Sequence, residues 1–194
     1  MSLFELFGKP RDDIFARKSE FERAVAKSKG KVVVVVHPFY DSHDPRDWKK
    51  SFPAEYFDRV NALMKQSKAP VIMFEERDRV HSTRGMLGAQ NVFFLRTKIA
   101  DSTPVAGWKR VHKLLQAAGA RTILIAGSHA LHKNPTPHLI DDKLIRLYEM
   151  TLGRNRRAPI VGGCVAGAYE QMIRQGYEKV RLVPHAVYPD KPKA

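Results

Sequence analysis

The only cysteine of the chain stands among small residues, in the segment Gly162-Gly163-Cys164-Val165-Ala166. Small residues on both sides of a nucleophile permit a tight turn from a strand into a helix, with the reactive side chain exposed. A cysteine that opens a helix faces the partial positive charge of the helix N-terminus, which favours the thiolate. The neighbouring backbone N–H groups can bind an oxyanion. The segment therefore indicates a nucleophilic cysteine, and the alternative interpretation is a small apolar side chain in a close helix–strand contact.

Polar side chains follow most of the strands that the sequence predicts, at the positions where those strands end. The carboxyl ends of parallel strands meet at one edge of a sheet, and ligands bind there. His185 ends the last predicted strand, and adjacent parallel strands lie about 4.8 Å apart, so His185 can serve as the base for Cys164. The residues expected to bind substrate at this edge are His37, Glu75, Arg96, Ser128, His129, Gly162 and Gly163.

Two common kinds of cofactor site are missing from the sequence. No G-x-G-x-x-G motif follows the first predicted strand and no Walker lysine motif occurs, which argues against a dinucleotide or P-loop site. The loop after that strand contains His37, Asp41, His43 and Asp44, but their spacing matches no strong zinc signature and indicates a solvated polar loop. We therefore expect neither a cofactor nor a metal.

Apolar spacing and helix-breaking residues predict an alternation of strands and helices that would position these groups. Residues 31–36 are almost all valine and do not alternate with polar residues, which is typical of a central strand buried on both faces. Thr103 followed by Pro104 predicts a helix start, with Val105 and Trp108 on the buried face of a helix that Gly119 ends. The remaining strands are expected at 71–74, 91–95, 121–126, 159–161 and 180–183, and the remaining helices at 13–29, 57–64, 139–152 and 165–173.

These elements predict one α/β domain over residues 1–194. It is expected to be a three-layer, Rossmann-like fold, with helices on both faces of a mostly parallel sheet. About six strands are expected, in the order 3-2-1-4-5-6. Residues 1–30 are expected to form an N-terminal helical extension, and residues 189–194 a flexible tail.

The chain is strongly basic: 34 Lys and Arg against 20 Asp and Glu leave a net charge of +14. This charge favours a polyanionic partner such as RNA, or a substrate that carries phosphate or carboxylate. The alternative is a solvated basic surface, because the excess charge is spread along the whole chain. The longest apolar run, residues 32–36, is too short to span a bilayer, and no secretory signal is visible. These features predict a cytoplasmic protein that acts on a small anionic molecule away from membranes, and they are compatible with a homo-oligomer.

Residues 159–188 resemble the nucleophile segment of the isochorismatase-like cysteine hydrolases. The shared features are a cysteine that opens a helix, an R-x-G-Y ending at residues 174–177, and a following strand with an Ala-Val pair. The resemblance implies a Rossmann-like sheet and hydrolysis of amide or vinyl-ether bonds by a Cys–Asp–Lys set. The family's lysine corresponds to Lys98. Its aspartate corresponds to His37, which leaves Asp41 as the nearest carboxylate.

The flanks of the cysteine differ from that family and point to a second resemblance. Gly162 and Gly163 stand where the isochorismatase-like enzymes have a Thr-Asp pair. These flanks are similar to those of glutamine-amidotransferase-like folds, whose Cys–His pair would correspond to Cys164 and His185.

Two functions of different classes follow from the sequence. The first is a cofactor-independent hydrolase of amide or related C–N or C–O bonds, with Cys164 as nucleophile and either His185 or Asp41 with Lys98 as its partners. The second is a non-catalytic Rossmann-like module that binds RNA or a phosphorylated ligand through a basic surface.

Overall fold

The fold is that of a computed structural model, which describes residues 13–38, 54–76, 91–98, 102–132, 146 and 160–189. The helix expected at 139–152 lies outside the described residues except for position 146. The same holds for residues 1–12 of the expected extension and for residues 190–194 of the expected tail.

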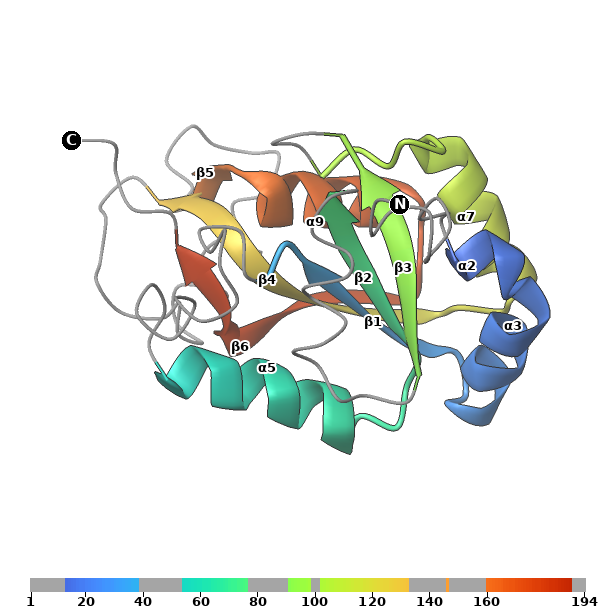
Figure 1. Cartoon of the computed structure of the whole chain (residues 1–194). Helices are drawn as coiled ribbons and strands as arrows, with labels where there is room; N and C mark the ends of the chain where they lie inside the picture. The colour runs from blue at the N-terminus through green and yellow to red at the C-terminus, as the bar shows by residue number, and fades with distance from the viewer. Residues whose placement is uncertain are drawn as a thin grey trace, which may run out of the picture.

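A parallel sheet of five strands forms the middle of the molecule (Figure 1). Its strands, in spatial order, are β3 (Val92–Thr97), β2 (Val71–Glu76), β1 (Lys31–Val36), β4 (Thr122–His132) and β6 (Lys179–Pro189). Helices cover both faces, so the expected α/β, Rossmann-like fold is confirmed. β1 lies in the middle of the sheet as predicted, because it pairs with β2 on one side and β4 on the other.

One part of the expected strand order is wrong. The short strand β5 (Ile160–Gly162) does not lie between β4 and β6; it pairs antiparallel with the far end of β4, where Leu131 faces Gly162. β4 and β6 are each 11 residues long and pair directly with each other from Thr122↔Lys179 onward. A strand of three residues forms too few hydrogen bonds to separate two long strands that pair in this way.

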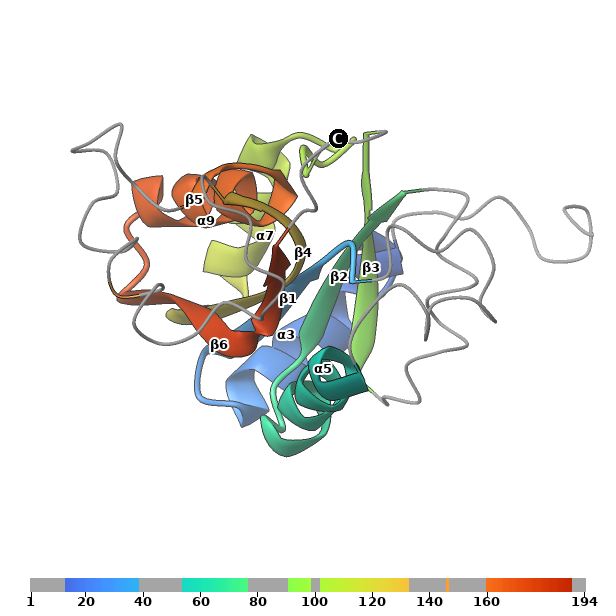
Figure 2. The ribbon, with the colours of Figure 1, turned by 90° about the vertical axis from the view of Figure 1, so that its left-hand side faces the viewer.

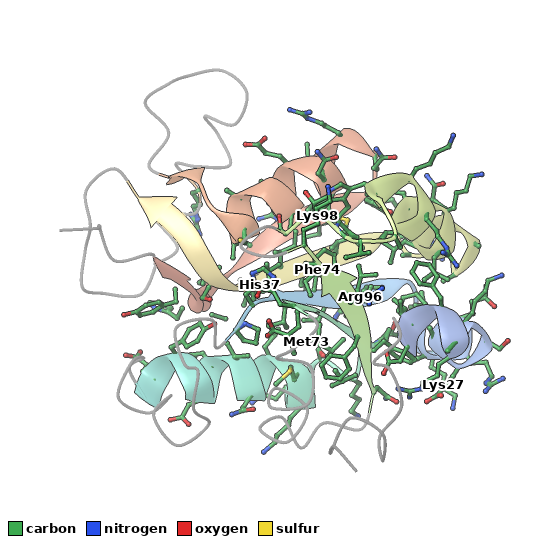
Figure 3. All side chains as sticks on the ribbon, turned by 45° about the horizontal axis from the view of Figure 1, so that its top comes forward. Lys27, His37, Met73, Phe74, Arg96 and Lys98 are labelled. Atoms are coloured by element: carbon green, nitrogen blue, oxygen red, sulfur yellow. The ribbon has the colours of Figure 1, made fainter. Side chains whose placement is uncertain are left out.

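The valines of β1 point alternately into two apolar cores, one on each face of the sheet. Val32, Val34 and Val36 join the core formed with α2 (Asp13–Ala16), α3 (Lys18–Lys27), α7 (Trp108–Ala117) and α9 (Cys164–Arg174). Val33 and Val35 join the core under α5 (Ala54–Gln66). Figures 1 and 2 show α9 and α5 on opposite sides of the sheet, and Figure 3 shows Phe74 and Met73 of β2, which belong to these two cores. Both faces of β1 are therefore buried, which explains why its sequence does not alternate.

The helix expected to start at Thr103 begins later, at Trp108. The chain first runs back along the end of β3: Pro104 bridges to Thr97, and the N–H of Val105 donates to the carbonyl of Arg96 at 2.8 Å. Val105 is consequently 49% exposed, not buried as predicted. Trp108 is partly buried and packs on Phe74, with ring centroids 5.6 Å apart, as its helical register predicted.

His112 is a buried histidine on the inner face of α7. Its ring stacks on Trp108 with centroids 5.5 Å apart, and its Nδ1 lies 3.0 Å from the hydroxyl of Tyr177. Burial lowers the pKa of His112 below its ordinary value of 6.5. The imidazole is therefore neutral in the folded chain under conditions in which the unfolded chain already binds a proton.

We expect the free energy of unfolding to fall as the pH drops below 6.5, because protons then bind the unfolded His112 more strongly than the folded one. Replacing His112 with Phe should flatten this part of the pH dependence, measured by urea denaturation. Tyr177→Phe is the control: it removes the hydroxyl partner but keeps the buried imidazole, and should leave the slope in place. An unchanged slope in His112→Phe would show that other groups cause it.

None of the helices within the described ranges combines the length and the hydropathy that crossing a bilayer requires.

Candidate active site at the carboxyl edge of the sheet

The order of the strands places a switch point between β1 and β4, since the chain builds the sheet outward in opposite directions from these two neighbours. His37 follows β1 directly, and Ser128 lies in β4 just past Gly127, which faces Val36. The hydroxyl of Ser128 donates to the backbone carbonyl of His37, and both residues are buried. Two of the predicted substrate-binding residues are thus brought together at the switch point.

His37 turns the chain sharply at the end of β1. Its φ is +40°, in the left-handed region that favours glycine, and its side chain is fully buried. The N–H of His37 donates to the carbonyl of Phe74 at 3.0 Å, and its Nε2 lies 2.9 Å from the hydroxyl of Thr97 on β3. The imidazole therefore extends across the end of β2 and links the first and third strands.

Glu75 and Arg96 stand opposite each other in the register of β2 and β3, on the face that α5 covers. Glu75 is 1% exposed, and its Oε1 accepts the N–H of Glu76 at 3.0 Å. A buried carboxylate beside an arginine on the next strand is a polar pair of a kind that apolar packing does not require. Figure 3 shows Arg96 on β3, Lys98 just after that strand and His37 just after β1.

Tyr56 is a site residue that the sequence did not reveal. Its hydroxyl donates to the carbonyl of Pro38 at 3.0 Å, and its ring packs against Tyr188 with centroids 5.5 Å apart. Burial raises the pKa of Tyr56 well above its ordinary value, and the nearby charge of Glu75 adds to this effect. The helix expected at 57–64 did not include Tyr56, whereas α5 begins at Ala54, and nothing in the sequence distinguished Tyr56 from a packed aromatic residue.

Cys164 opens α9 at the same edge of the sheet. The strand–turn–helix arrangement is confirmed: β5 ends at Gly162, Gly163 adopts φ +90°, and α9 begins with Cys164. α9 leads back to β6, whose first residue Lys179 faces Thr122 at the start of β4. Cys164 consequently lies at the carboxyl end of the strands, and its thiol is partly buried against the core.

The segment after β3 reaches the first turns of α9. The N–H of Lys98 donates to the carbonyl of Thr103 at 3.0 Å, which folds this segment back. Ser102 is buried, and its hydroxyl oxygen lies 3.0 Å from where a side chain at Gly167 would begin. Gly167 is one turn from Cys164, so the end of β3, with its exposed Lys98, approaches the start of α9.

The prediction that His185 ends β6 is wrong, because His185 lies within that strand. The register passes from Ile125↔Leu182 to Gly127↔Val187, so β6 contains a large bulge, and His185 has φ +58° there. The extra residues fit because β6 is an edge strand with no neighbour on its outer side in the described sheet. In the part of the chain that the structure describes, no hydrogen bond joins His185 to Cys164.

Several predicted groups cannot be placed. Asp41, with its neighbours His43 and Asp44, lies outside the described residues, and the side chain of His129 is not described although its backbone belongs to β4. Among the described residues, no group of three or more His, Cys, Asp or Glu side chains is arranged to hold a metal ion.

The carboxyl edge thus gathers a cysteine at a helix start, a buried histidine–threonine pair, a buried carboxylate and two basic side chains. No protein-family model, curated protein or solved structure matches the chain, so the interpretation of this edge rests on its own residues.

Proposed function

We propose that the chain is a cofactor-independent hydrolase of amide or related C–N or C–O bonds, with Cys164 as its nucleophile. The observation that carries the proposal is the turn from β5 through Gly163 into α9, which starts that helix with the only thiol of the chain. This turn lies at the edge where parallel α/β sheets bind their ligands. A thiol of this kind suits the reducing cytoplasm, where it stays unpaired.

In the proposed reaction the thiolate of Cys164 attacks the carbonyl carbon of the substrate. The tetrahedral oxyanion accepts hydrogen bonds from backbone N–H groups in the first turn of α9, which have no partner within the helix. Collapse breaks the C–N or C–O bond, and the leaving group takes the proton that the base accepted from the thiol when the thiolate formed. Water then attacks the thioester and releases the acid and the thiol.

Two side chains are proposed as partners of the thiol. The positive charge of Lys98 stabilises the thiolate and attracts an anionic substrate. His185 carries the proton between the thiol and the leaving group. The bulge that holds it supports this role, because bulges next to active sites redirect side chains, and a positive φ in a non-glycine residue is a cost that function can justify.

The rate at which iodoacetamide modifies the native protein tests the proposal without knowledge of the substrate. Because Cys164 is the only cysteine, modification reports on it alone. We expect rapid modification well below pH 8, because in the proposed site the helix start and the positive charge of Lys98 favour the thiolate. Lys98→Met and His185→Ala should each shift the rate profile to higher pH.

Lys18→Met is the matched control, because it removes an exposed lysine on α3 that is not part of the carboxyl edge. Its profile should equal that of the unmodified chain. Protection of Cys164 from pH 6 to 9 until the chain unfolds would contradict the proposal.

A further inference from the structure

A row of basic side chains lies at the opposite edge of the sheet, where the strands begin. Lys68 precedes β2, Lys31 opens β1, Arg121 precedes β4 and Lys179 opens β6. These are four consecutive strands of the sheet, and all four side chains are exposed. Together with Lys29, which lies two residues before Lys31, they are called the amino-edge row below. Figure 3 shows that Lys27, which ends α3 near this edge, is well separated from His37.

Backbone pairing holds the members of the row side by side. Lys31 and Lys179 both pair with Thr122, one from each side. The N–H of Arg121 donates to the carbonyl of Gly30 at 2.8 Å, and the N–H of Lys179 donates to the carbonyl of Arg121 at 3.1 Å. Neighbouring strands lie about 4.8 Å apart, so the row extends about 14 Å along the edge with a cation near every strand.

Little negative charge offsets the row within the described part of the chain. Glu178 lies 3.9 Å from Arg121, and both side chains are about two-thirds exposed, so water weakens this pair strongly. No ion pair within the described residues involves Lys29, Lys31, Lys68 or Lys179. The row therefore presents several free ammonium groups to solvent.

Two lysines of the row have a strained backbone. Lys29 has φ +56° and Lys68 has φ +49°, each in the turn that follows a helix, where glycine is the usual residue. The only other non-glycine residues with positive φ in the described ranges are His37 and His185, at the candidate active site. Lysine at these two turns is conformationally worse than glycine, which points to a use for its side chain.

We infer that the amino-edge row binds the phosphate backbone of a nucleic-acid duplex without reading its sequence. Ammonium groups in a row suit a regular line of phosphates. Single strands are bound by stacking bases on aromatic rings, and no aromatic ring among the described side chains is exposed. Membrane surfaces are bound by basic helices that also insert several large apolar side chains, and Ile173 is the one such exposed side chain near this edge in the described residues.

This inference is independent of the proposed hydrolase. The row and Cys164 lie at opposite ends of the strands, so both can be occupied at once, and neither experiment depends on the result of the other.

Binding of short RNA and DNA duplexes, measured by fluorescence anisotropy over a range of salt concentrations, tests the inference. The edge variant replaces Lys31, Lys68, Arg121 and Lys179 with Gln. We expect its affinity to fall at least about 10-fold, and the slope of log affinity against log salt to become shallower by about 3 to 4. The control variant replaces four exposed basic residues elsewhere with Gln, which removes the same charge; they are Lys18, Arg59, Lys109 and Lys113. It should keep most of the affinity and the slope.

A second variant, Lys29→Gly with Lys68→Gly, separates binding from folding. Glycine accepts the left-handed turns, so the thermal midpoint should stay or rise while duplex affinity falls. If the edge and control variants lose the same amount of duplex affinity, net charge alone explains the binding and the inference is overturned. Tighter binding to phosphatidylserine vesicles than to duplex, lost in the edge variant, would also overturn it and assign the row to membranes.

Discussion

Replacing Cys164 with Ala is expected to abolish hydrolysis, lowering kcat/KM at least about 1,000-fold. The thiol forms the covalent intermediate in the proposed reaction, so no other group in the site replaces it. The assay is a panel of small anionic amides and activated esters, with product release followed by absorbance. The two proteins are compared on those substrates that the unmodified chain hydrolyses faster than the buffer without protein does.

The Cys164→Ala variant should keep the native fold, because the thiol is only partly buried and alanine is smaller. Its stability therefore serves as the control for the loss of activity. Its thermal midpoint should lie close to that of the unmodified chain. Cys164→Ser keeps the size of the side chain and should also be nearly inactive, because a hydroxyl at a helix start is not ionised at neutral pH. Full activity in either variant would exclude Cys164 as nucleophile, and a panel without any turnover would leave the thiol reactivity of the native chain as the deciding measurement.

The sequence predicted the sheet well because its strands are buried on both faces. The valine run of β1 has no polar face, so both of its faces have to be buried, and this was enough to predict a central strand. The turn into α9 was predictable for a related reason: Gly163 adopts φ +90°, a conformation that the glycine pair before Cys164 had indicated.

The errors arise where pairing between distant segments overrides local preference. Thr103 and Pro104 have the types that begin a helix, but a bridge to Thr97 holds them against the end of β3. His185 was expected to end β6, yet this strand has no paired neighbour on its outer side in the described sheet, which allows a bulge that local sequence does not specify. Spacing also could not show that Tyr56 reaches the carbonyl of Pro38, a contact that depends on how α5 packs on the sheet.

Replacing Gly127 with Ala is expected to cost about 4 kcal/mol or more of the free energy of unfolding, among the largest effects a single methyl group can have. Gly127 has φ +126°, which residues with a side chain rarely adopt. A Cβ there would lie 2.0 Å from the carbonyl oxygen of Val36 and 2.6 Å from its nitrogen. Both contacts are with backbone, so no side chain can rotate away, and β4 has to move off β1.

That displacement falls at the switch point. Gly127 faces Val36, and the next residue, Ser128, donates to the carbonyl of His37, so moving β4 also breaks this bond at the candidate site. Gly119→Ala is the matched control: Gly119 has φ +75°, but nothing lies within 4 Å of its Cβ position. Gly119→Ala should lower the free energy of unfolding only by the cost of a left-handed backbone in alanine, about 1 to 2 kcal/mol. Urea denaturation measures the free energy of unfolding of both variants. If Gly127→Ala does not fold at all, which circular dichroism would show, the expectation is also met. Equal stability of the two variants would mean that β1 and β4 do not approach as closely at this point as the geometry requires.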